Sequence, residues 1–185
     1  METTKNKTRQ TLYLIAGLLV AVGMLIALGR SSSGTDQGGS GGVPSNPQNK
    51  PTLTQTGKLV AKDAYYDFGT VSMAKGEVSR MFVFTNTSDR PVAVHKLYTS
   101  CMCTVATLLY KDERVGPFGM PGHGFIPSID KIIAPGASVE LEITFDPAAH
   151  GPAGVGAIQR VVTLEEQEGE TLSVAQVGFS AVVTP

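Results

Sequence analysis

From Lys58 onward, apolar and polar residues alternate along the chain, and this alternation constrains the fold more than any other feature. The clearest example is Ser138–Phe145, S-V-E-L-E-I-T-F, in which every second residue is apolar and the others are polar. A period of two with one apolar face predicts a half-buried antiparallel strand. The same pattern predicts six more strands, at residues 59–67, 78–85, 91–97, 104–110, 158–165 and 171–183.

Two of these segments make sharper predictions. In the segment 78–85 we expect Phe82 and Phe84 on the inner face of the strand. In the segment 91–97, Val92 and Val94 share one phase of the alternation, but Leu97 falls in the other. This change of phase predicts a β-bulge shortly before the cysteines.

Seven short strands without a helical apolar period indicate an all-β fold, an immunoglobulin-like seven-stranded antiparallel β-sandwich over residues 58–185. Turn-forming sequences such as Pro135-Gly136 separate the strands. The inter-sheet disulfide of antibody domains is excluded, because Cys101 and Cys103 are neighbours in the sequence and are the only cysteines. The core must therefore be held by packing alone.

The N-terminal part has a different character. Residues 11–29 are nineteen residues without a charge, and at about 1.5 Å per residue such a helix spans a hydrocarbon core of about 30 Å. Lys5, Lys7 and Arg9 precede it, which predicts that residues 1–10 stay in the cytoplasm. A cleaved signal peptide is the alternative, but the apolar stretch is longer than such peptides carry, which favours an uncleaved signal anchor.

Residues 30–57 are rich in Gly, Ser, Pro, Asn, Gln and Thr, a composition that predicts a flexible linker. The expected arrangement is a single-pass protein of the cell membrane, attached by its N-terminal helix, with an extracytoplasmic domain. The formal net charge of −1 argues against nucleic acid as a partner.

Five short motifs occur in an order typical of one bacterial family: D-F-G-T-V at 67–71, F-V-F-T-N-T at 82–87, S-C-M-C-T at 100–104, A-P-G at 134–136 and F-D-P at 145–147. Over residues 62–183 the chain resembles domain-of-unknown-function family 1573, which is similar to Hydin-type and major-sperm-protein-like immunoglobulin folds. The resemblance implies an exported seven-stranded sandwich without established enzymatic activity, used for scaffolding or protein binding. The chain departs from the family pattern at Met102, where glycine is expected, and in an insertion over residues 108–126.

The two cysteines allow three interpretations. In an extended strand, Cys101 and Cys103 share a face with Cα atoms about 6.7 Å apart. They could be buried small hydrophobic residues, or a strained disulfide that acts as a thiol redox switch. They could also chelate a thiophilic metal such as Cu(I). For this metal site Met120 and His123, in the sequence M-P-G-H, are the expected further ligands.

Other candidate residues are fewer. His95 and His150 are further candidate ligands, and the run Glu165, Glu166, Glu168 and Glu170 is expected to form a solvated turn. No P-loop, H-E-x-x-H or G-x-S-x-G sequence is present, so we expect a binding module that is not an enzyme and has no cofactor.

The expected interaction surface for an extracytoplasmic protein partner is the end of the sandwich built from residues 108–126 and 147–157. Loops at the ends of a sandwich can vary while the strands hold the core. Phe118, Met120 and Phe125 would give this surface an apolar centre.

Overall fold

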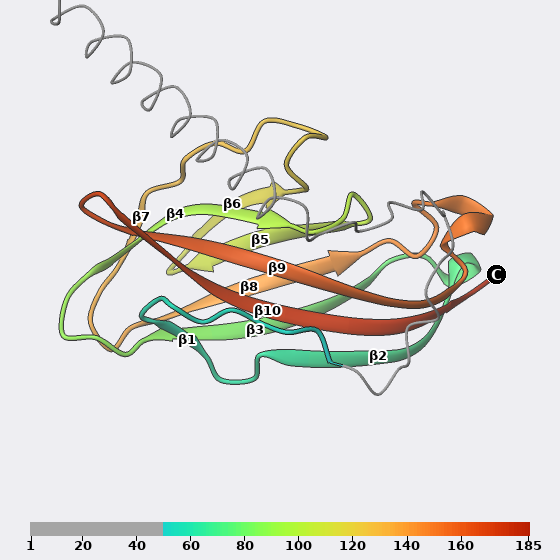
Figure 1. The fold of residues 1–185 in the computed structure, drawn as a ribbon, viewed down its shortest axis with the longest axis horizontal. Coiled ribbons are helices and arrows are strands. Elements are labelled where there is room, and N and C mark those ends of the chain that lie inside the picture. Colours follow the sequence, from blue (N-terminus) through green and yellow to red (C-terminus); the bar gives the residue numbers. More distant parts are fainter. Residues whose placement is uncertain (1–49) are drawn as a thin grey trace, which may run out of the picture. The chain divides into compact units, whose positions relative to one another are not determined.

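The computed structural model describes residues 50–185, which form a sandwich of two five-stranded sheets (Figure 1). The first sheet has the order β1-β3-β8-β5-β6 and the second has the order β2-β10-β9-β4-β7. The all-β sandwich is therefore confirmed, with ten strands in place of seven. Their bounds are β1 Leu59–Ala61, β2 Tyr65–Ser72, β3 Val78–Asn86, β4 Val92–Thr99, β5 Thr104–Tyr110, β6 Glu113–Phe118, β7 Lys131–Ile133, β8 Ser138–Phe145, β9 Gly156–Glu168 and β10 Thr171–Thr184.

The core lies between the sheets and follows the predicted alternation. In β8 the exposed and buried residues alternate, and Leu141 and Ile143 are fully buried. In β3, Phe82 and Phe84 point inward as predicted, with 3% and 0% of their surface exposed. Burying one such side chain contributes about 1.5–3 kcal/mol, so packing of the inward residues stabilises the sandwich without an inter-sheet disulfide.

The predicted strand over residues 59–67 is in fact two strands in different sheets. β1 pairs antiparallel with β3, whereas β2 pairs parallel with β10. The chain crosses between the sheets at residues 62–64, where Lys62-Asp63 interrupts the apolar alternation. The sandwich is therefore not purely antiparallel, because the edge strand β2 runs parallel to its neighbour β10.

Two further strands were missed because they lie at sheet edges. β6 pairs with β5 and β7 pairs with β4, and each is the outermost strand of its sheet. β6 contains Gly116 and Pro117, which weaken a strand signal, but at an edge the missing N–H of proline breaks no ladder bond. The first half of the insertion over residues 108–126 therefore belongs to the β5–β6 hairpin, and the exposed loop begins only after Phe118.

The predicted bulge is confirmed. The register of β4 against β9 shifts between Val94 and Lys96, and this shift returns Leu97 to the core, where it is fully buried. The extra residue places the last residues of β4 in phase with the core, just before the cysteines. The bulge therefore determines which way the following turn faces.

The connections between strands gather at two opposite ends of the sandwich. One end, here called the Cys end, holds the turn 100–103, the 3₁₀ helix η1 (Met73–Lys75) and the β8–β9 connection with the 3₁₀ helix η2 (Gly151–Gly154). Figure 1 shows η1 and η2 close to the C-terminus at this end. The other end, here called the Asn86 end, holds residues 87–91 and the β9–β10 turn.

The predicted cytoplasmic N-terminus 1–10, the membrane helix 11–29 and most of the linker 30–57 lie outside the described residues. Within residues 50–185, no helix has the length and apolar character that a bilayer span requires. Residues 54–57 contact β10 by hydrogen bonds, for example from the backbone N–H groups of Thr56 and Gly57 to the carbonyl of Val174. The last four residues of the predicted linker therefore lie against β10.

Candidate functional site

The two cysteines lie in a tight turn that joins β4 to β5. The backbone N–H of Thr104 donates a hydrogen bond to the carbonyl of Cys101 at 3.2 Å, which closes a β-turn. The hydroxyl of Thr99 stabilises it by donating to the carbonyls of Cys101 and Thr104. The extended geometry expected for this segment is therefore wrong, but both cysteines are buried as a pair, whereas Met102 between them is 48% exposed.

The sulfur of Cys101 is the centre of a small cluster. It lies 3.1 Å from Nε2 of His150, and the backbone N–H of Cys103 donates to it at 3.4 Å. Cys101, Cys103 and His150 each offer one ligand atom, and these atoms all lie within 4.8 Å of one another. Both cysteines are free thiols. We call these three residues the Cys–His cluster.

His150 is held beside the cysteines by the start of the β8–β9 connection. The backbone N–H of Asp146 donates to the carbonyl of Cys103 at 2.9 Å, which ties this connection to the cysteine turn. The carboxylate of Asp146 then accepts from the N–H of Ala148, and the N–H of Gly151 donates to the carbonyl of Ala148 at 2.8 Å. The imidazole of His150 is thus positioned by backbone contacts on both sides, although the residue is exposed.

Arg160, on β9, contacts the cluster from the second sheet. Its Nε donates a hydrogen bond to the sulfur of Cys103 at 3.3 Å, and its Nη1 donates to the carbonyl of Gln159 at 2.7 Å. A guanidinium next to a sulfur stabilises the thiolate over the thiol. The cluster therefore contains two sulfurs, one imidazole and one permanent positive charge.

These contacts separate the acidities of the two thiols. Burial opposes ionisation of Cys101. Hydrogen bonds from the side chain and backbone of Cys103 and from His150, with the charge of Arg160, outweigh burial and lower the pKa of Cys101 to about 7. Burial and the neighbouring Cys101 raise the pKa of Cys103, against the hydrogen bond from Arg160. Near neutral pH, Cys101 is consequently the thiol that loses its proton first.

The structure divides the predicted ligands between two places. Cys101 and Cys103 meet His150, whereas Met120 and His123 line a separate groove of about 360 Å³ together with Met102. The third histidine, His95, lies away from the cluster, with its Nδ1 2.8 Å from the carboxylate of Asp130.

Of the residues predicted to bind a partner, the structure leaves two at the surface. Phe118 is only 8% exposed and packs in the core, so the prediction that it forms the centre of a surface was wrong. It is the last residue of β6, and its inward direction follows from a pairing that the sequence did not reveal. Phe125 is 89% exposed, and Met120 is half-buried beside it in the groove.

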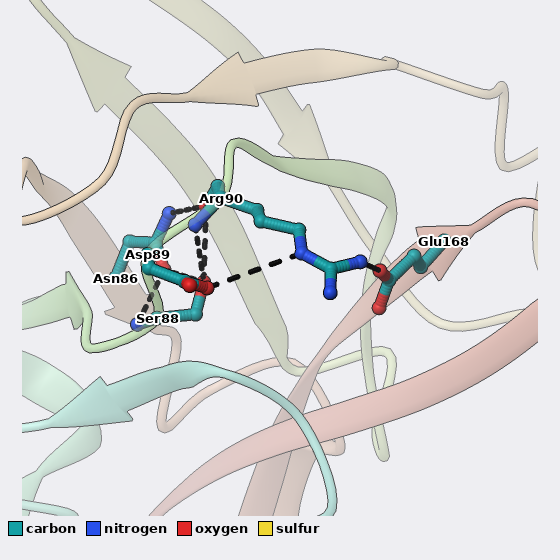
Figure 2. A network of polar contacts seen from close by, with 5 residues as sticks. All are labelled: Asn86, Ser88, Asp89, Arg90 and Glu168. Atoms are coloured by element: carbon teal, nitrogen blue, oxygen red, sulfur yellow. Dashed lines mark hydrogen bonds and ion pairs between the residues drawn. The ribbon is translucent and has the colours of Figure 1, made fainter.

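The Asn86 end holds a pocket of about 400 Å³, and the charged groups of Arg90 and Glu166 that line it have partners within the chain. Figure 2 shows the side chain of Asn86 among the β3–β4 turn residues, with Arg90 reaching toward Glu168. The Asn86 amide donates to the carbonyl of Arg90 at 2.8 Å, and its oxygen accepts from the hydroxyl of Ser88 at 2.7 Å. Nη1 of Arg90 lies 3.3 Å from the Glu168 carboxylate.

Glu166 borders the same pocket, and its prediction as part of a solvated turn was wrong. It is 2% exposed, and its carboxylate accepts hydrogen bonds from the backbone N–H groups of Lys58 at 2.7 Å and Leu59 at 3.0 Å. The Glu166 carboxylate therefore satisfies backbone N–H groups at the start of β1 that a neighbouring strand would otherwise bind. Only Glu168 and Glu170 are exposed as expected, and Glu165 is half-buried.

Comparisons with known proteins concern the family and the fold. The profile of the family described as "Protein of unknown function (DUF1573)" matches residues 59–117. No curated protein matches the sequence. Among solved structures, a protein of unknown function from Porphyromonas gingivalis W83 has a TM-score of 0.47 at 17% identity, covering 67% of this chain and 46% of its own.

Two further structures are similar at lower scores. The VesB protease of Vibrio cholerae has a TM-score of 0.44 at 16% identity, over 69% of this chain and 32% of its own. The PapD-like domain 7 of human CEP192 has a TM-score of 0.42 at 14% identity, over 75% of this chain and 92% of its own. The chain therefore spans less than half the length of the first two proteins. The match to the DUF1573 profile covers residues 59–117, which include the cysteine turn, and it supports the resemblance indicated by the motifs within that range.

Proposed function

We propose that this chain is a membrane-anchored, extracytoplasmic binding module whose Cys–His cluster holds a thiophilic metal ion, Cu(I). The observation that carries the proposal is the convergence of two sulfurs and one imidazole nitrogen within 4.8 Å. Ligand bonds of about 2.0–2.3 Å allow donor atoms of one ion to be up to about 4.6 Å apart. The free thiols therefore need only small side-chain movements to share an ion.

The number and type of donors favour Cu(I) over zinc. Structural zinc sites are almost always four-coordinate, whereas the cluster among the described residues offers three His, Cys or carboxylate ligands. Soft thiolates select Cu(I) or zinc over hard cations such as calcium. Three soft donors suit a monovalent ion of low coordination number.

The charges point the same way. Two thiolates and one Cu(I) sum to one negative charge, which the neighbouring Arg160 balances. The same ligands around a divalent ion would be neutral and would leave the guanidinium without a counter-charge beside a buried group. Because unpaired buried charge is unfavourable, the contact from Arg160 to Cys103 at 3.3 Å supports the monovalent ion.

Each residue has a defined part in binding. Cys101, with a pKa of about 7, gives up its proton near neutral pH, and binding releases the proton of Cys103. Arg160 donates to the sulfur of Cys103 and fixes its direction, as outer-shell hydrogen bonds do around metal ligands. His150 completes the set from the exposed side.

The cellular location is part of the proposal. The uncharged stretch 11–29 and the basic residues before it support an anchor whose C-terminal side lies outside the cytoplasm. A domain tethered there would take up or hold the ion at the membrane surface, without catalysing a reaction.

The test is competition for Cu(I). The full chain, purified reduced and anaerobically in detergent, is titrated with Cu(I) in the presence of bicinchoninate. With bicinchoninate in excess, we expect the wild type to withdraw one tightly held ion, this tight ion to be lost in Cys101→Ser/Cys103→Ser, and its retention to be weakened in His150→Ala. His95→Ala is the matched control and should behave as wild type. Equal retention by the wild type and the double cysteine variant would overturn the proposal.

A second candidate function is binding of an extracytoplasmic protein partner. The observation in its favour is the connection between β6 and β7, which extends away from the two sheets (Figure 1) and carries Phe125 with 89% of its surface exposed. A photo-crosslinking residue in place of Phe125 should give a protein adduct in intact cells. The same residue in place of Leu172, also exposed at 56%, is the control, and equal labelling from both positions would contradict a specific partner.

A further inference from the structure

The sequence M-P-G-H forms a β-turn that places two soft metal donors side by side. The backbone N–H of His123 donates to the carbonyl of Met120 at 3.2 Å. Gly122, the third residue of the turn, has a φ of 90°, a value that favours glycine at this position of a type II turn. The first and fourth residues of a β-turn have Cα atoms within about 7 Å. The thioether of Met120 and the imidazole of His123 therefore start from adjacent positions.

A third soft donor faces the same space. Met102 lines the groove of about 360 Å³ with Met120 and His123. Met102 is 48% exposed, so its position is not explained by core packing. It is also the residue between Cys101 and Cys103, so that the wall of the groove and the Cys–His cluster share one turn.

The chemistry of the groove is soft and uncharged. No Asp, Glu, Lys or Arg lines it, so it lacks the oxygen ligands that magnesium or calcium require. Thioethers and imidazole suit Cu(I). Without a thiolate they hold it more weakly than the Cys–His cluster would, because no negative charge faces the ion.

We propose that Met102, Met120 and His123 form a second, weaker Cu(I) site, open to solvent, which passes the ion to Cys101, Cys103 and His150. The transfer of the ion to the Cys–His cluster rests on the proposed function, whereas binding of Cu(I) in the groove does not. The step is a ligand exchange: the bonds from copper to the thioethers and the imidazole break as bonds to the thiolates form. The thiol protons go to solvent, and copper stays Cu(I) throughout, so no oxidant or reductant is needed.

Accessibility gives the two sites different roles. Cys101 and Cys103 are 8% and 3% exposed, so a bulky copper complex in solution has little direct access to their sulfurs. The groove donors lie at the surface, and His123 is exposed. In this proposal the groove accepts the ion quickly at the surface, and the buried Cys–His cluster binds it more tightly.

The test follows loading of the full chain in detergent from a Cu(I)–bicinchoninate complex, anaerobically, by stopped-flow absorbance and by titration. The variant Met102→Leu/Met120→Leu/His123→Gln removes the groove donors and leaves the core intact. The matched control is Met81→Leu/His95→Gln, since Met81 is an exposed methionine on the outer face of β3 and His95 lies outside both sites.

We expect the wild type and the control to bind two ions, one tightly and one weakly. The groove variant should keep the tight ion, lose the weak one and load roughly tenfold more slowly, a factor that corresponds to 1.4 kcal/mol. Wild-type stoichiometry and rate in the groove variant would overturn the inference.

The cysteine variant separates the two proposals. Cys101→Ser/Cys103→Ser should lose the tight ion and retain the weak one. Loss of both ions in this variant would overturn the groove as an independent site. Retention of both ions in the cysteine variant would overturn the Cys–His cluster as the tight site, and the transfer step would fall with it. In that case, loss of the weak ion in the groove variant would still support the groove as a binding site.

Discussion

The two ends of the sandwich bury polar groups in different ways. At the Asn86 end, the buried Glu166 and Asn86 bond mainly to backbone groups, such as the N–H of Leu59 and the carbonyl of Ile133. At the Cys end, the buried sulfurs of Cys101 and Cys103 contact the side chains of His150 and Arg160. Backbone partners hold one geometry and cannot titrate, whereas the Cys101 thiol beside its side-chain partners can lose a proton and bind an ion. The first pattern indicates a structural role and the second a chemical one.

Cavity size alone would have suggested the opposite assignment. The pocket at the Asn86 end, about 400 Å³, is the larger, and the groove beside the cysteines is about 360 Å³. Among the described residues, no buried side-chain nitrogen or oxygen lacks a partner. The Glu166 carboxylate that borders the larger pocket already accepts two backbone hydrogen bonds at the start of β1, and the difference between the ends lies in donor chemistry.

The largest effect on stability is expected at Glu166. Glu166→Ala should lower the free energy of unfolding by about 2–4 kcal/mol, because the N–H groups of Lys58 and Leu59 lose a charged acceptor in a buried place. Glu168→Ala, at an exposed carboxylate two residues away, is the control and should change it by less than about 0.5 kcal/mol. Urea unfolding followed by circular dichroism measures both, and equal effects would contradict a structural role for Glu166.

Asn86 should come next. Asn86→Ala removes hydrogen bonds to the carbonyls of Arg90 and Ile133 and should lower the free energy of unfolding by about 1–3 kcal/mol. Cu(I) affinity should be unchanged, because the cluster lies at the other end of the strands. A variant that folds but loses Cu(I) would show that the two ends are not independent.

The Cys end should respond to pH instead. In the metal-free full chain, alkylation of Cys101 by iodoacetamide should rise through a midpoint near pH 7, since its pKa is about 7 and only the thiolate reacts. Cys103, whose pKa is raised, should react only at higher pH. In His150→Ala the midpoint for Cys101 should move upward, because a hydrogen bond that lowers its pKa is lost. Peptide mass spectrometry separates the two sites, and a single shared midpoint would contradict the asymmetry.

The smallest effect is expected for the ion pair of Figure 2 between Arg90 and Glu168, whose side chains are 75% and 69% exposed. A double-mutant cycle of Arg90→Ala and Glu168→Ala should give a coupling below about 0.5 kcal/mol, since solvent screens such pairs. A coupling above about 1 kcal/mol would mean that the Asn86 end depends on surface charge as well as on its buried bonds.

The sequence predicted the strands whose signal is local. β5 and β8 were predicted to the residue, and β8 carries a complete alternation of apolar and polar residues. The bulge in β4 was visible as a change of phase before Leu97. By contrast, β6 and β7 are edge strands that are recognised only by their pairing with β5 and β4. The crossing from β1 to β2 was not predicted, because it depends on which sheet each strand joins.

The candidate site was predicted in part for the same reason. Cys101 and Cys103 were found because they are adjacent in the sequence, but His150 and Arg160 reach them from 49 and 57 residues away. Such contacts depend on the pairing of whole strands. His123 was preferred over His150 because the insertion offers it together with Met120 as M-P-G-H, and nothing in the sequence around Arg160 distinguishes it from a surface residue.

The most direct test of the central claim is X-ray absorption at the copper edge of the full chain loaded with one equivalent of Cu(I). The account predicts a three-coordinate ion with two sulfur ligands and one nitrogen ligand. The nitrogen should disappear in His150→Ala and remain in His95→Ala. A copper shell without sulfur, or one that His150→Ala leaves unchanged, would contradict the assignment of the Cys–His cluster as a metal site.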